Sequence, residues 1–283
     1  MNLAAESDFL LGMAASSHQR DVHARALLSD AQQRSQLLCL DASVPLYLEE
    51  EGFDVIAEIK KRSPAEGELD ANLASPELQA SAYIQGGAAA LSVLTEPDQF
   101  RGSLTDLHAV SQQSVNVPVM RKDFLVSRYQ VREARLAGAS GVLLIAAMLE
   151  NGQMQAMLEA AFELDLFVLM EAFDQADLDK CVPVLESFGP ALDETGRCNY
   201  LLGVNCRDLR TLQVNFAHFA HMAPSMPTFM PWVAESGVNE TAQVEALARL
   251  GYRAALVGTA LMRSDDPAAK VADFRRAGRS ACS

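Results

Sequence analysis

The chain has 283 residues, of which 49% are hydrophobic and 21% are charged, which is the composition of a globular protein. Its formal net charge of −14 argues against a nucleic-acid surface, and no apolar run approaches the roughly 20 residues of a membrane helix. We expect a soluble, cytoplasmic protein with neither a nucleic-acid nor a membrane partner. An anionic small-molecule ligand stays compatible with this charge, because local cations would hold it.

The first 50 residues differ from the rest of the chain. Stretches such as HARALLSDAQQRSQLLCL (23–40) predict helices that precede the first strand. The N-terminus has no basic segment typical of a secretory signal, and His18 and His23 are interpreted as surface residues of these helices. We divide the chain into an N-terminal helical extension, 1–50, and a catalytic barrel, 51–283, within a single domain overall.

From residue 54 onward, short aliphatic runs alternate with stretches that carry apolar residues at helical spacing. The runs are DVIAEI (54–59), ALSVLT (90–95), VPVMR (117–121), GVLLI (141–145), LFVLM (166–170), YLLGVN (200–205), PWVAES (231–236) and AALVG (254–258). Continuous apolar runs between helices indicate a parallel sheet that is covered on both faces. Eight such units predict an α/β fold, a (β/α)₈ TIM barrel; a doubly wound open sheet is the competing arrangement. The segment 181–200 is expected to be a loop or an irregular excursion.

Charged and amide side chains stand at the ends of these runs. They are Glu58, Lys60, Lys122, Glu171, Asn205 and Glu235, and Glu96 follows the second run. A single charge at a strand end is usually a solvated loop residue or half of a structural ion pair. The carboxyl ends of barrel strands meet at one rim, however, so these six side chains are expected to converge. Crowded carboxylates and ammonium groups shift one another's pKa values, as acid–base catalysis requires, and we predict an active site there.

The loops after the last two runs predict a phosphate site. They read ESGVNE (235–240) and VGTALMR (257–263), and barrels often bind phosphate in these two loops. Gly237 and Gly258 would let backbone N–H groups approach the phosphate, and Ser236 and Thr259 would add hydroxyl donors.

Other candidate residues carry less weight. His218 and His221 form an H-x-x-H pattern without a third ligand, so an amphipathic helix face is the preferred interpretation. The five cysteines show no metal-binding spacing. Cys206 is interpreted as a small buried side chain, although a reactive thiolate beside Arg207 stays open at this point.

Several blocks together resemble indole-3-glycerol phosphate synthase. They are VIAEIKKRSPAEG, LSVLTEPDQFRGSLTDL, PVMRKDFLVSRYQVREARLAGASGVLLIAAML, LGVNCRDLRTLQVN, VAESGV and ALVGTALMRSDDP, between about residues 54 and 267. The resemblance implies a carboxy-lyase of tryptophan biosynthesis that needs no cofactor or metal. Its substrate would be 1-(2-carboxyphenylamino)-1-deoxyribulose 5-phosphate. We expect a monomer or weak homodimer.

The resemblance also implies roles for individual residues. Lys122 would be the general acid of ring closure, and Lys60 and Glu58 would serve as acid and base of the later dehydration. Glu171 and Glu235 would stabilise a cationic ring nitrogen, and Asn205 would hold a substrate hydroxyl. The remaining assigned residues would bind the substrate: Ser63, Arg207, Ser236, Gly237, Gly258 and Thr259 around the phosphate, and Phe100 and Phe124 against the anthranilate ring.

Three positions depart from the family pattern, namely Ala65, Cys206 and the pair Ala172–Phe173. These departures leave two alternatives open. One is a divergent paralogue of secondary metabolism that acts on a related anthranilate-derived ribulose phosphate. The other is a barrel that binds a phosphorylated ligand without turnover. Phosphoribosylanthranilate isomerase is a weaker alternative, because no cysteine ends the first strand.

Overall fold

The computed structural model describes residues 9–49, 52–64, 67–68, 75–208 and 212–282. Its centre is a closed barrel of parallel strands, in the order β10-β11-β12-β2-β5-β6-β7-β8. The strands are β2 (Asp54–Ile59), β5 (Ala90–Leu94), β6 (Val119–Lys122), β7 (Gly141–Ile145), β8 (Phe167–Ala172), β10 (Tyr200–Asn205), β11 (Trp232–Glu235) and β12 (Ala254–Val257). Pairing of β12 with β2 closes the barrel, so the chain is a TIM barrel and the open sheet is wrong.

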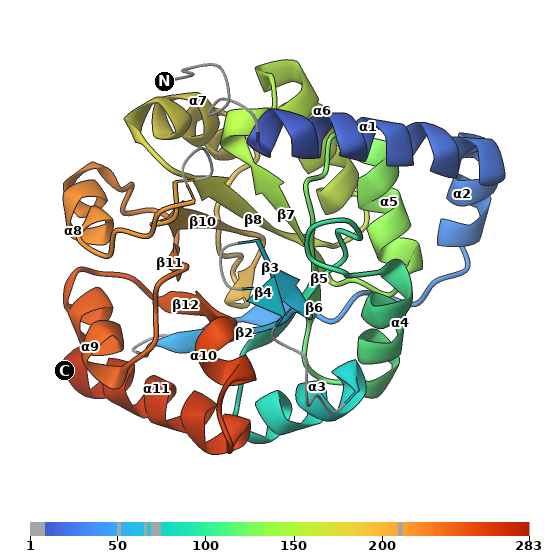
Figure 1. The fold of residues 1–283 in the computed structure, drawn as a ribbon. Coiled ribbons are helices and arrows are strands. Elements are labelled where there is room, and N and C mark those ends of the chain that lie inside the picture. Colours follow the sequence, from blue (N-terminus) through green and yellow to red (C-terminus); the bar gives the residue numbers. More distant parts are fainter. Residues whose placement is uncertain (1–8, 50–51, 65–66, 69–74, 209–211, 283) are drawn as a thin grey trace, which may run out of the picture.

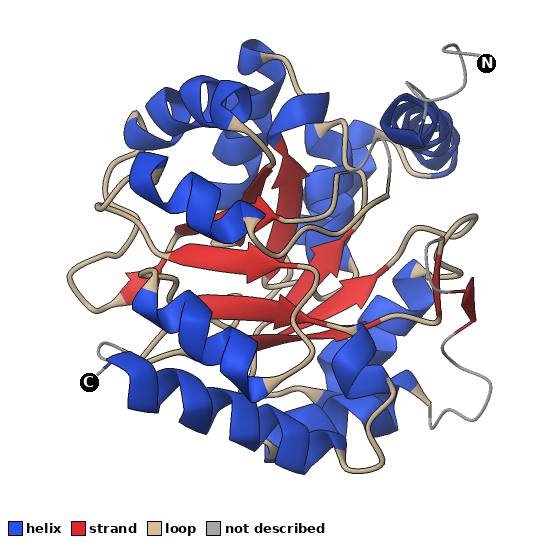
Figure 2. Ribbon diagram, turned by 60° about the vertical axis from the view of Figure 1, so that its left-hand side comes forward, coloured by secondary structure: helices blue, strands red, loops and turns tan. Residues whose placement is uncertain are grey.

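Helices cover the outside of this barrel, as Figures 1 and 2 show. They are α3 (Pro76–Gln85), α4 (Leu104–Gln113), α5 (Arg128–Leu136), α6 (Asn151–Phe162), α7 (Gln175–Glu186), α8 (His218–Met222), α9 (Thr241–Arg249), α10 (Thr259–Met262) and α11 (Pro267–Cys282). The single-turn helices η1 (Ala146–Met148) and η2 (Ala223–Ser225) lie in the connections. Several helices begin where the side chain of Ser or Asp accepts a backbone N–H, as Ser103, Ser127 and Asp174 do for α4, α5 and α7.

The alternation of side chains along each strand divides the core into two layers. One layer fills the barrel interior, with Ile56, Met120 and Leu201 among its members. The other layer packs the outer strand faces against the helices and includes Val55, Val142 and Val204. Strands buried on both faces need apolar residues at every position, which explains why the sequence shows continuous runs rather than alternation.

Two helices precede the barrel strands, α1 (Phe9–Leu27) and α2 (Asp30–Leu37). α1 contacts α5 and η1, and α2 packs against α5 (Figure 1). The short strand β1 (Leu46–Tyr47) then pairs antiparallel with β9 (Arg197–Cys198), and β3 (Arg62–Ser63) pairs with β4 (Gly67–Glu68) just after β2. The proposed boundary between residues 50 and 51 lies outside the described residues.

The predicted strand ranges match the observed ones to within two residues at either end. The prediction for 181–200 was partly wrong, because residues up to Glu186 continue α7. Leu178, Cys181 and Leu185 bury one side of that helix, and this packing outweighs the helix-breaking effect of Pro183. The irregular part begins after Glu186 and ends in β9.

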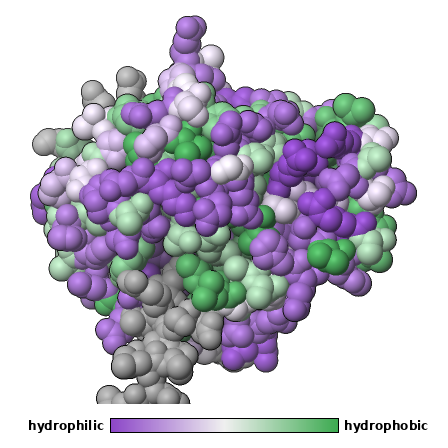
Figure 3. Space-filling model, turned by 90° about the horizontal axis from the view of Figure 1, so that it is seen from above, coloured by the Kyte–Doolittle hydropathy of each residue, from purple (hydrophilic) through white to green (hydrophobic). Residues whose placement is uncertain are grey.

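No helix in the described part of the chain has the length and hydropathy of a membrane span. On the face seen in Figure 3, hydrophilic and hydrophobic side chains are interspersed.

Candidate active site

The six predicted strand-end residues lie together at one rim of the barrel. Glu58 is in β2, Lys122 ends β6, Glu171 is in β8, and Asn205 and Glu235 end β10 and β11. Lys60 directly follows β2. Five of the six line one cavity, whereas Glu235 is 1% exposed and lies beside Lys122 in the barrel interior.

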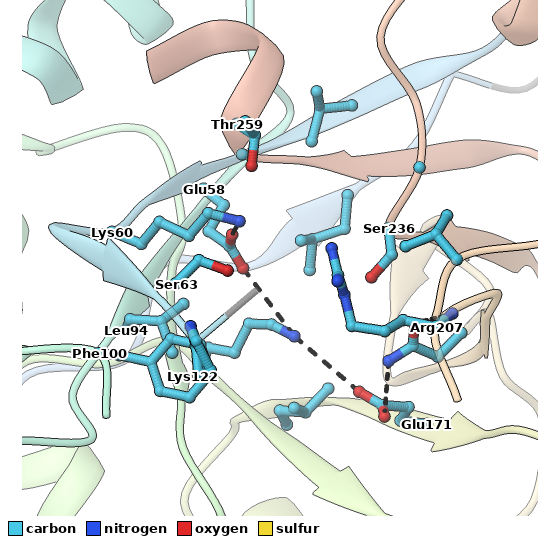
Figure 4. Close-up of a pocket in the computed structure, with 18 of the residues that line it drawn as sticks. Glu58, Lys60, Ser63, Leu94, Phe100, Lys122, Glu171, Arg207, Ser236 and Thr259 are labelled. Carbon is cyan, nitrogen blue, oxygen red and sulfur yellow. Dashed lines mark hydrogen bonds and ion pairs between the residues drawn. The ribbon is translucent and has the colours of Figure 1, made fainter. Parts of the chain in front are cut away.

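Lys122 stands at the centre of a group of carboxylates. Its Nζ lies 3.4 Å from Glu235 Oε2 and 3.9 Å from one oxygen each of Glu58 and Glu171. Figure 4 shows Lys122 pointing into the space between Glu58 and Glu171. A second ammonium, Lys60 Nζ, lies 2.8 Å from Glu58 Oε1. Two lysines therefore share three buried carboxylates.

This crowding moves the pKa values in opposite directions. Burial alone would lower the pKa of Lys122, but Glu235, Glu171 and Glu58 outweigh it and raise the pKa. Burial would raise the pKa of Glu58, but Lys60 and Lys122 bring it below its ordinary value. Burial, with Glu171 and Glu58 nearby, raises the pKa of Glu235 to about 8 against the opposing effect of Lys122. The cluster thus contains a firmly charged lysine and a carboxyl group that titrates near neutral pH.

Asn205 links this cluster to the opposite side of the cavity. Its Nδ2 donates to Glu171 Oε1 at 3.0 Å, while its Oδ1 accepts the backbone N–H of Arg207 at 2.9 Å. The Arg207 guanidinium donates to the Leu212 carbonyl at 3.1 Å. Asn205 therefore orients both a carboxylate and the backbone that carries Arg207.

The predicted phosphate-binding residues line the same cavity, namely Ser63, Arg207, Ser236, Gly237, Gly258 and Thr259. Ser236 and Gly237 both adopt left-handed backbone, with φ of 68° and 70°. This conformation is unusual for serine and typical of a constrained functional turn. Gly258 precedes α10, and a Cβ there would overlap Glu58 Oε1 and lie 2.9 Å from Lys60 Nζ. Glycine at this position leaves room for the Glu58–Lys60 pair.

Phe100 and Phe124 also line the cavity, with ring centroids 6.1 Å apart. The first residue of α1, Phe9, meets Phe124 edge-on at 5.9 Å and lines the cavity as well. Sequence reasoning missed Phe9, because nothing in its local pattern shows where the N-terminal helix docks. The result is an aromatic wall of three rings.

A buried ionic network next to Lys122 was also missed. Asp123 is 1% exposed; it accepts two bonds from Arg20 of α1, at 2.9 and 2.8 Å, and one from Thr95 at 2.7 Å. Arg121 Nη2 donates to Asp123 at 3.1 Å. The charged run RKD was the only sequence signal for this network. It ties α1 to the end of β6.

Glu96 has a different position from the cavity residues. Its carboxylate accepts the backbone N–H groups of Asp98, Gln99 and Phe100, at 3.1, 2.7 and 3.0 Å. Glu96 therefore shapes the loop that carries Phe100.

The candidates given less weight have structural explanations. Burial raises the pKa of the Cys206 thiol to about 12, which rules out a reactive thiolate. His218 stacks on Phe173, with ring centroids 4.6 Å apart, and His18 and His23 are exposed on α1. Within the described residues, no group of three or more His, Cys, Asp or Glu side chains is arranged to hold a metal ion. Ala65 lies outside the described residues.

Comparison with known proteins agrees with this geometry. The family model described as indole-3-glycerol phosphate synthase matches residues 15–274. The chain is 41% identical over 251 residues to an indole-3-glycerol phosphate synthase from Mycolicibacterium gilvum, covering 89% of this chain and 87% of that protein. It is 44% identical over 231 residues to the synthase of Mycobacterium tuberculosis, covering 82% and 79%.

Among solved structures, 3-hexulose-6-phosphate synthase from Salmonella typhimurium superposes with a TM-score of 0.61. The match covers 81% of this chain and 100% of that one at 14% identity, so it shows the fold alone. Family model and close relatives agree over most of the chain, and the protein belongs to the indole-3-glycerol phosphate synthase family.

Proposed function

We propose that this protein converts 1-(2-carboxyphenylamino)-1-deoxyribulose 5-phosphate into indole-3-glycerol phosphate, with loss of carbon dioxide and water, in tryptophan biosynthesis. The observation that carries the proposal is the position of Lys122, between three carboxylates at the floor of a cavity with an aromatic wall. Membership of the family and this geometry support the same reaction.

Lys122 is the general acid of ring closure. The ring carbon that bears the carboxylate attacks the ketone carbon, and Lys122 Nζ gives a proton to the ketone oxygen as the new carbon–carbon bond forms. The surrounding carboxylates keep the ammonium charged and available until the developing alkoxide takes its proton. Carbon dioxide then leaves, and its bonding electrons restore the aromatic ring.

Dehydration uses the neighbouring pair. Lys60 protonates the departing hydroxyl, while Glu58 removes the proton from the adjacent carbon to form the indole double bond. Their charged atoms lie 2.8 Å apart, so a proton taken up by Glu58 can return to Lys60 for the next turnover. The opposite assignment would give ring closure to Lys60 and dehydration to Lys122. The intermediate that accumulates in a variant of each lysine distinguishes the two assignments.

Glu171 and Glu235 stabilise the ring nitrogen as it becomes cationic, and Asn205 binds a substrate hydroxyl. Ser63, Arg207, Ser236, Gly237, Gly258 and Thr259 hold the phosphate. Thr259 and Ser236 line the cavity from different strand ends, after β12 and β11 (Figure 4). Phe100, Phe124 and Phe9 pack against the anthranilate ring, where they also exclude water from the reacting carbon.

The experiment that tests the proposal is a fluorescence assay for the indole product with purified protein and the proposed substrate. Lys122→Met should abolish ring closure and leave binding of a phosphorylated ligand measurable. Lys61→Met is the matched control, because Lys61 pairs with Asp106 at 2.7 Å and does not line the cavity. Wild-type turnover in Lys122→Met would remove Lys122 from the role of general acid.

Other outcomes of the same assay separate the alternatives. Binding without product by the wild-type protein would favour a paralogue with another anthranilate-derived substrate, or a barrel without turnover. We also propose a cytoplasmic location, activity without cofactor or metal, and a monomer or weak homodimer. Light scattering during gel filtration measures the last of these.

A further inference from the structure

The carboxylate of Glu235 lies against Gly203, which has no side chain. Gly203 is in the middle of β10, where its Cα is paired with Glu171 of β8 and with Val233 of β11. A Cβ at Gly203 would overlap Glu235 Oε1 and lie 3.1 Å from the carboxyl carbon. The Glu235 carboxylate therefore occupies the space that any other residue at 203 would fill.

Packing rather than hydrogen bonding holds Oε1 of the Glu235 carboxylate. Within the described part of the chain, Glu235 Oε1 is buried and has no hydrogen-bond partner. The other oxygen, Oε2, lies 3.4 Å from Lys122 Nζ. Because Oε1 has no hydrogen-bond partner, packing sets its position. The space left by the missing side chain of Gly203 is where this oxygen fits.

We infer that Gly203 is a positioning residue for the reaction, because its missing side chain leaves room inside the barrel for the Glu235 carboxylate and so fixes its place beside Lys122. This inference rests on the proposed function and adds to it a residue that touches neither substrate nor phosphate.

A small substitution isolates this effect. In Gly203→Ala, the methyl group meets the far end of a flexible side chain, so Glu235 moves and the backbone of β10 stays in place. We expect its carboxylate to be displaced toward Lys122 and the cavity, where it meets water and leaves the position from which it stabilises the ring nitrogen. A displacement of about 1 Å at a catalytic group can cost about 100-fold in rate.

Two alanine variants serve as controls. Gly141→Ala also adds a methyl group inside the barrel, but it meets the ring of Phe167 and no carboxylate. Gly152→Ala, in α6, meets no atom within 4 Å. Thermal unfolding of all three variants measures the cost of overpacking, and steady-state kinetics measures the cost to the reaction.

The expected result is that Gly203→Ala stays folded and loses about 10- to 100-fold in kcat. Gly141→Ala should lose stability to a similar or greater extent and keep most of its kcat, and Gly152→Ala should resemble the wild type. Wild-type kcat in Gly203→Ala, or equal losses of kcat in Gly203→Ala and Gly141→Ala, would overturn the inference.

A second measurement does not depend on turnover. Carbon-13 NMR titration of the glutamate carboxyl groups, assigned with Glu235→Gln, follows the ionisation of Glu235 directly. Displacement of the carboxylate into water lessens its burial, so its pKa should fall by about one unit or more in Gly203→Ala and stay unchanged in Gly141→Ala. An unchanged titration in Gly203→Ala overturns the inference even if the wild-type protein proves inactive on the proposed substrate, which is the separate failure of the proposed function.

Discussion

At the scale of single residues, the neighbours of two glutamates in the site shift their pKa values in opposite directions. Glu58 and Glu235 are both buried glutamates within reach of Lys122. Glu58 has a second cation, Lys60, and its pKa lies below the ordinary value. Glu235 has no second lysine at ion-pair distance among the described residues and faces Glu171, and its pKa is raised to about 8. The sequence predicted both residues as members of the site. It could not give the direction of their pKa shifts, which depends on atoms from other strands.

This difference predicts the pH dependence of activity. In the proposed reaction Glu235 must be ionised to stabilise the cationic nitrogen, and it is protonated below its pKa of about 8. We therefore expect kcat/KM to rise with pH through about 8 and then level off. Steady-state kinetics from pH 5.5 to 9.5 measures this limb. The rise of kcat/KM with pH should disappear in Glu235→Gln. A rise that persists unchanged in that variant would come from the ionisation of another group.

The cysteines give a second prediction at this scale. Cys39 and Cys282 are exposed, whereas Cys181, Cys198 and Cys206 are buried, and burial raises the pKa of each of these three thiols to about 12. Because the thiolate is the reactive form, an aromatic disulfide reagent should modify the two exposed thiols rapidly and the other three only on unfolding. Mass spectrometry of the partly labelled protein identifies the sites. Rapid labelling of Cys206 would contradict its burial beside the Ser236 carbonyl.

At the scale of elements, the N-terminal helix α1 contributes to the site from outside the barrel. Phe9 lines the cavity, and Arg20 binds Asp123 with two hydrogen bonds. Burial would raise the pKa of Asp123, but Arg121 and Arg20 outweigh it and hold the pKa far below its usual range. The helices of the first 50 residues were predicted from their periodicity, yet this docking was not, because it requires a partner more than a hundred residues away. The division into residues 1–50 and 51–283 stays a prediction.

We expect Arg20→Ala to loosen this contact. Loss of the two charged hydrogen bonds should cost about 1.5–3 kcal/mol of unfolding free energy. It should also raise KM, because Phe9 would no longer be held against Phe124. Gln19→Ala, an exposed change on the same helix, is the matched control for helix formation. Denaturant unfolding together with kinetics checks both effects, and a destabilised variant with unchanged KM would separate α1 from substrate binding.

At the scale of the whole molecule, the barrel gathers its buried charges at one rim at a cost in stability. Buried carboxylates near one another are unfavourable when ionised, and Lys60 and Lys122, together with Arg207, offset them within the cavity. Sites that are arranged for reaction commonly reduce the stability of the fold that carries them.

This cost should be visible in the pH dependence of stability. The pKa of Glu235 in the folded protein, about 8, lies above its ordinary value of 4.5, so the folded state binds this proton more tightly than the unfolded state. Its effect on the unfolding free energy therefore becomes less favourable as pH rises from about 5 to 8. Glu235→Gln should unfold at a higher temperature than the wild type, by an amount that grows across this range. Glu245→Gln, on the surface of α9, is the control, and a pH-independent difference would contradict the prediction.

The sequence by itself determined the barrel and the residues of its rim. Continuous apolar runs identify strands buried on both faces, and parallel strands in a closed barrel must bring their carboxyl ends together, so Glu58, Lys122 and Glu171 could be grouped without coordinates. Only the tertiary structure decided what lies across the barrel from each of these groups. Three contacts depend on distances between segments that are remote in the sequence. They are the packing of Glu235 against Gly203, the contact of Phe9 with Phe124 and the ion pair of Arg20 with Asp123. Local periodicity records which face of an element is buried, but packing alone determines which atoms meet there.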